Sequence, residues 1–67
     1  MNYEKSVGDV CAGRAAKLAK EYIGAAEKAT GEDREALLLR ATNAADMYEI
    51  LTGEILDEVM AKIFILL

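Results

Sequence analysis

Residues 30–56, TGEDREALLLRATNAADMYEILTGEIL, contain the most regular apolar pattern in the chain. Its apolar residues recur at alternating steps of four and three: Leu37, Ala41, Ala44, Tyr48, Leu51 and Ile55. An average step of about 3.5 residues is typical of an apolar seam along an α-helix. The stretch therefore predicts a helix that begins just after Thr30 and Gly31, where Glu32 and Asp33 suit the positive end of the helix dipole.

The pair Thr52-Gly53 leaves two interpretations of the C-terminal half open. The apolar pattern crosses the pair without a change of phase, which favours one long helix. A glycine after threonine is also a signal for a break or a new helix start, and we favour the break. The sequence thus predicts helices over 32–51 and 54–66, with a single continuous helix as the alternative.

A first helix is predicted over 7–29. Its main apolar face follows helical steps: Val7, Cys11, Ala15, Leu18, Tyr22, Ala26 and Ala29. A neighbouring line contains only small residues, which let a partner helix approach closely: Gly8, Ala12, Ala16 and Ala19. Ser6 before Asp9, and Thr30 before Asp33, each place a hydroxyl three residues ahead of a carboxylate, close to the capping-box pattern at a helix start.

Composition supports an all-α fold in a single domain, 1–67. The 67 residues contain no Pro, and strong helix formers dominate. A monomer of this size is marginally stable, because a short chain buries a small share of its surface. Cys11 is the only cysteine and there is no His, which excludes an internal disulfide and argues against a zinc site. We therefore expect a small bundle of two to three helices that oligomerisation completes.

The C-terminal stretch is apolar around most of its circumference. We expect its apolar side chains, with the end of the preceding seam, to form an interaction surface: Leu51, Ile55, Leu56, Val59, Met60, Ile63, Phe64 and Leu67. The stretch is too short and too charged to span a membrane. If Leu51 and Ile55 are buried in the seam, truncating either to Ala should cost about 2–5 kcal/mol of stability.

Charge is distributed unevenly between the two halves. Residues 32–67 contain eight acids and three bases, whereas residues 1–31 contain four acids and five bases. The acidic half disfavours nucleic acid and favours a basic protein partner. The candidate acidic face consists of Asp46, Glu49, Glu54, Asp57 and Glu58.

No set of residues in the sequence indicates catalysis, a metal or a cofactor. Carboxylates at helical spacing, such as Asp46 with Glu49 and Glu54 with Glu58, are best explained as a solvated face. Cys11 has no His or second Cys to activate it, and we expect it to be a small core residue. A modest basic ridge on the first helix permits, but only weakly favours, nucleic-acid binding: Arg14, Lys17, Lys20 and Lys28.

These observations favour a non-enzymatic protein–protein interaction module that self-associates through its apolar C-terminal helix. One alternative is a small acidic inhibitor that docks on a nucleic-acid-binding protein. Phage and mobile-element inhibitors, anti-CRISPR proteins among them, share this size and charge, although no motif links the chain to them. A helical-hairpin RNA binder is the third alternative. The unpaired cysteine and the absence of a recognisable signal peptide lead us to expect a cytoplasmic protein.

Overall fold

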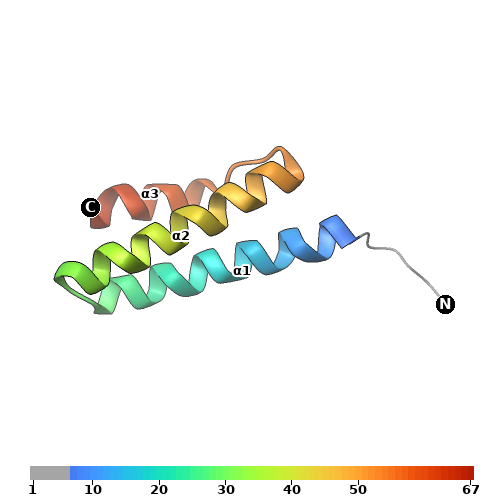
Figure 1. The fold of residues 1–67 in the computed structure, drawn as a ribbon. Helices are drawn as coiled ribbons and strands as arrows, with labels where there is room; N and C mark the ends of the chain where they lie inside the picture. Colours follow the sequence, from blue (N-terminus) through green and yellow to red (C-terminus); the bar gives the residue numbers. More distant parts are fainter. Residues whose placement is uncertain (1–6) are drawn as a thin grey trace.

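The protein is a hairpin of two long helices with a short third helix folded back along it (Figure 1). The computed structural model describes residues 7–67. Helix α1 spans Val7–Lys28, α2 spans Gly31–Thr52 and α3 spans Asp57–Leu66, and the described residues contain no strand. The prediction of an all-α fold is confirmed, and of the two to three helices expected, the described residues form three. The predicted bounds agree within one residue except at the start of α3, which begins three residues later than expected. That oligomerisation completes the bundle stays a prediction.

The Thr52-Gly53 pair ends α2, so the break is confirmed and the single long helix is wrong. Gly53 adopts a left-handed conformation with φ of 76°, and its N–H donates to the carbonyl of Glu49 at 2.7 Å. The Thr52 hydroxyl donates to the carbonyl of Tyr48 at 2.8 Å and accepts the N–H of Glu54 at 3.0 Å. The pair therefore satisfies polar groups at a helix end rather than starting α3.

The capping box predicted at Thr30 does not form. Thr30 occupies the N-cap position with extended backbone angles, but its side chain makes no capping hydrogen bond. Instead, the guanidinium Nε of Arg34 donates to the carbonyls of Ala26 and Ala29, at 3.1 and 3.0 Å. Arg34 thus ties the first turn of α2 to the last turn of α1. The other predicted start signal, at Ser6, lies outside the described residues.

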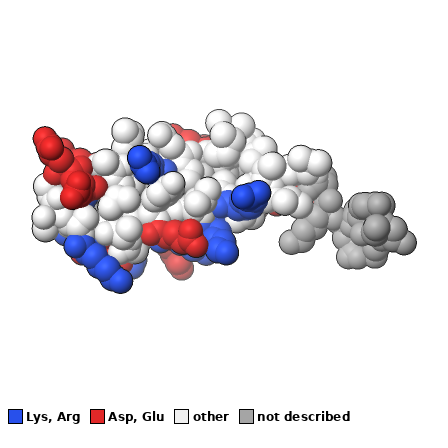
Figure 2. Space-filling model, turned by 60° about the horizontal axis from the view of Figure 1, so that its bottom comes forward, with Lys and Arg blue, Asp and Glu red and all other residues white. Residues whose placement is uncertain are grey.

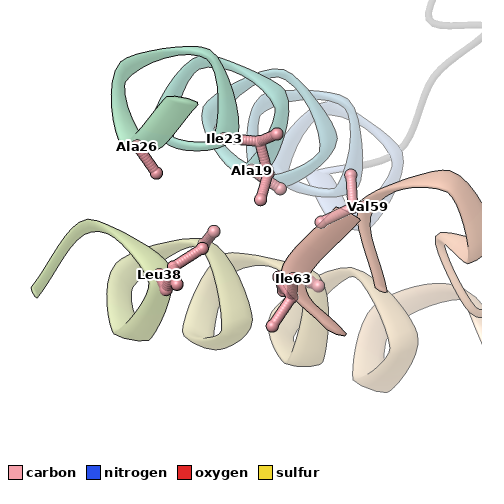
Figure 3. Packing of buried hydrophobic residues seen from close by; sticks show 8 residues of the cluster. Ala19, Ile23, Ala26, Leu38, Val59 and Ile63 are labelled. Atoms are coloured by element: carbon pink, nitrogen blue, oxygen red, sulfur yellow. The ribbon is translucent and has the colours of Figure 1, made fainter. Parts of the chain in front are cut away.

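The core lies between the three helices and is rich in alanine (Figure 3). Six of the ten buried apolar residues are alanines. The larger ones come from all three helices: Ile23 of α1, Leu38 of α2, and Val59 and Ile63 of α3. Small side chains let α1 and α2 approach closely, but each contributes little buried apolar area. The core is therefore closely packed and thin.

The predicted apolar face of α1 lies only partly in the core, where Ala15 and Ala26 are buried. Val7 is 81% exposed, Leu18 is 43% exposed, and Cys11 is exposed, so the prediction of a buried Cys11 is wrong. The line of small residues lies closer to the centre of the interface, since Ala12 and Ala19 are buried. A helix turns by about 100° per residue, so a one-residue error in the stripe moves it well off the contact.

The seam predicted on α2 also lies only partly in the core, where its member Ala41 is buried. The buried residues of α2 are Leu38, Ala41 and Ala45, whereas Leu51 is 39% exposed and Ile55, in the turn after α2, is 57% exposed. The condition for a large loss of stability on truncating Leu51 or Ile55 is therefore not met within one copy of the chain. Tyr22 and Tyr48 are half-buried, at the border between core and solvent.

Candidate interaction surfaces

The chain's own core contains part of the apolar surface that the sequence analysis proposed for interaction. Val59 and Ile63 are 3% and 5% exposed, and they pack against α1 and α2. Leu56 and Met60 are half-buried against the same core. These four side chains hold α3 on the hairpin, and the buried Val59 and Ile63 are not available to a partner while α3 stays packed.

Other large apolar side chains at the end of α3 are exposed, whereas Leu66 packs against the core. Phe64 is 72% exposed, Leu67 is 79% exposed, and the neighbouring Ile65, which was not among the predicted interaction residues, is 80% exposed. We call Phe64, Ile65 and Leu67 the α3 outer face. A run of four apolar residues at 64–67 cannot face one core on a helix, and that run is the signal that could have identified Ile65.

Helix α3 covers only one of the two flanks of the hairpin. The Nζ of Lys62 lies 3.3 Å from a carboxylate oxygen of Glu27. A hollow between the two helices is lined by Lys20 and Ile23 of α1 together with Val59 of α3. The flank of α1 that bears Lys20, Ile23 and Glu27 is therefore the covered one, and α3 lies behind α2 in Figure 1.

The opposite flank of the hairpin is largely apolar, and no helix among residues 7–67 covers it. By helical spacing, its residues are Leu18 and Tyr22 of α1 and Leu37, Ala44, Tyr48 and Leu51 of α2. We call this set the open hairpin face. Tyr22, Leu37 and Ala44 pack against the core from this side and keep part of their surface exposed. Figure 2 turns α1 towards the viewer, and the upper part of this view is mostly uncharged, with a few charged side chains among the uncharged ones.

The acidic candidates gather at one end of the molecule. Asp46 and Glu49 lie near the end of α2, Glu54 is in the turn, and Asp57 and Glu58 form the start of α3. All five side chains are exposed. The chain reverses direction at this turn, which brings the two acidic segments to the same end. The arrangement is a solvated acidic end around the α2–α3 turn.

The predicted basic ridge is divided between two sides of α1. Lys20 lines the hollow next to α3, together with Glu58. Arg14 and Lys17 lie on the other side and flank a shallow hollow that also contains Glu21. A continuous positive track would suit a phosphate backbone better than this division, so the arrangement gives little support to RNA binding.

The described part of the chain contains no arrangement that indicates chemistry. No cluster of three or more Cys, Asp or Glu residues could hold a metal ion there. No helix among residues 7–67 is long and apolar enough to cross a bilayer. Comparison of the chain with protein-family models, with curated proteins and with solved structures finds no match.

Proposed function

We propose that the chain is a non-enzymatic protein–protein interaction module that self-associates, with the α3 outer face as the contact surface. The observation that carries the proposal is the exposure of Phe64, Ile65 and Leu67, each more than 70% accessible to solvent. Large apolar side chains that cluster on a surface mark sites of association. Burying each of them in a partner stabilises the complex by about 1.5–3 kcal/mol before the costs of association.

The thin core gives a second reason for association. Six of the ten buried apolar residues are alanines, and none of the large side chains in the described residues is fully buried. Any surface that is buried only in the assembled form stabilises the folded chain by mass action. The acidic end around the α2–α3 turn lies at the start of α3, away from the α3 outer face, and stays open to a basic partner.

Light scattering over a wide range of concentrations tests the proposal on the double variant Phe64→Glu/Ile65→Glu. Both side chains are exposed, so the charges should leave the fold intact and oppose burial in a partner. We expect the wild type to form assemblies at concentrations where the variant is smaller. Val10→Glu is the matched control, since Val10 is a 50% exposed apolar residue on α1. Equal masses for wild type and double variant at every concentration would refute the role of α3.

A further inference from the structure

We propose that the open hairpin face binds the open hairpin face of a second copy, so that two hairpins form an antiparallel four-helix bundle with each α3 on the outside. This inference goes beyond the proposed function, which concerns the α3 outer face. The two surfaces lie on opposite sides of the hairpin, because α3 covers the flank that bears Lys20 and Glu27. One copy can therefore use both surfaces at once.

The open hairpin face contains several large apolar side chains that remain partly exposed. Leu18 and Leu51 are 43% and 39% exposed, and Tyr22, Leu37 and Tyr48 are half-buried. On the covered flank, Ile23 and Leu38 share a core cluster with Val59 and Ile63 of α3, and they are 4% and 3% exposed. The open flank has side chains of similar size and no cover of this kind among residues 7–67.

Charged residues recur at regular intervals along the two edges of this face. On α1, Arg14, Glu21 and Lys28 recur every seven residues, between the open face and the outer side of the helix. On α2, Asp33 and Arg40 occupy the equivalent edge at the same spacing. Charged residues at seven-residue intervals beside an apolar seam select partners in bundles of packed helices.

Two-fold symmetry brings these edges together with opposite charges. A two-fold axis parallel to the helices places α1 of one copy beside α2 of the other and keeps every residue at its own height. Height here means the distance along the helix axes. It is counted from the hairpin turn, which contains only Ala29 and Thr30. Glu21 then lies within about 3 Å in height of Arg40 of the partner subunit. Lys28 and Asp33 of the partner subunit match in the same way, and symmetry makes each pair twice.

These charged side chains have no partner within the described part of one copy. Glu21, Lys28, Asp33 and Arg40 are all exposed, and none of their side chains makes a hydrogen bond or ion pair with another residue of 7–67. Arg14, the third position on the α1 edge, lies opposite the apolar Met47 of the partner subunit. No like charges therefore meet at any of the three levels. This complementarity identifies a second copy, rather than an unrelated apolar segment, as the occupant.

Charge-reversal variants test the interface. Sedimentation equilibrium measures the dimer dissociation constant in the Phe64→Glu/Ile65→Glu background, where the α3 outer face should no longer associate. Glu21→Arg and Arg40→Glu should each weaken the dimer by about tenfold or more, because attraction is replaced by repulsion at two symmetric sites. An equimolar mixture of the two variants should associate more tightly than either alone, since both cross-pairs are then attractive. Circular dichroism checks that each variant remains helical.

Two variants on the covered side serve as matched controls. Asp46→Arg and Lys20→Glu make the same changes in charge away from the open hairpin face, and both should leave the dimer constant within about twofold. A background variant that is monomeric at every concentration would overturn the inference, as would a mixture no tighter than its components. Failure of the α3 proposal has a different signature, namely equal masses with and without the two α3 substitutions. Association with an unrelated acidic or apolar peptide, but not with a second copy, would also overturn the inference.

Discussion

Two pairs of neighbouring residues, Tyr22 with Ile23 and Leu37 with Leu38, show how differently the two flanks of one hairpin behave. Ile23 and Leu38 face α3 and are 4% and 3% exposed, while Tyr22 and Leu37 face the open side and are half-buried. The members of each pair are adjacent in sequence, and Leu37 and Leu38 are chemically identical, whereas Tyr22 has a hydroxyl that Ile23 lacks. Their difference arises from the position of α3. This helix of ten residues determines which flank is buried in a hairpin more than four times its length.

The largest expected effect comes from truncating the buried member of a pair. Leu38→Ala should destabilise the protein by about 2–5 kcal/mol, because it leaves a cavity between all three helices. Leu37→Ala removes the same atoms from the open side and should cost about 1 kcal/mol. Urea unfolding at one low protein concentration measures both. Equal losses would show that α3 does not distinguish the flanks.

A smaller effect is expected at the turn that positions α3. Gly53→Ala introduces a side chain where φ is 76°, and an added Cβ would have no atom within 4 Å, so the cost is in the backbone alone. We expect a loss of about 1–2 kcal/mol. Gly24→Ala is the control, since Gly24 lies in a helix interior with equal space, and there alanine should stabilise by about 0.5–1 kcal/mol. A Gly53 variant as stable as wild type would contradict the left-handed cap.

The smallest effect is expected for the ion pair that links α3 to α1. Lys62 and Glu27 are 53% and 46% exposed, so water screens their attraction. Lys62→Met keeps the apolar stem and should change stability by less than about 1 kcal/mol, as should Glu27→Gln. The double variant should show almost no coupling in a thermodynamic cycle. A coupling above that range would mean that charge, and not Val59 and Ile63, holds α3 on its flank.

Part of the candidate interaction surface could be predicted from sequence, and part could not. The exposed run at Phe64 and Leu67 follows from composition, since more apolar residues occur there than one core can cover. The division of the same helix into a buried side with Val59 and Ile63 and an exposed side does not follow, because it depends on which groove α3 enters. The hydrogen bonds of Arg34 to the end of α1 were also missed, since an arginine in a first helical turn has no distinctive spacing.

The sequence by itself determined the helical fold and the bounds of α1 and α2 to within one residue, but it placed the start of α3 three residues too early. A chain without Pro, rich in alanine and leucine, forms helices by local propensity, and glycines at Gly31 and Gly53 interrupt them through their own backbone freedom. Only the tertiary structure decided which side of each helix is core. The apolar residues of α1 and α2 span an arc wider than one neighbouring helix can cover, so periodicity alone cannot choose Leu38 over Leu37. The packing of α3 against one flank makes that choice and leaves the other flank open.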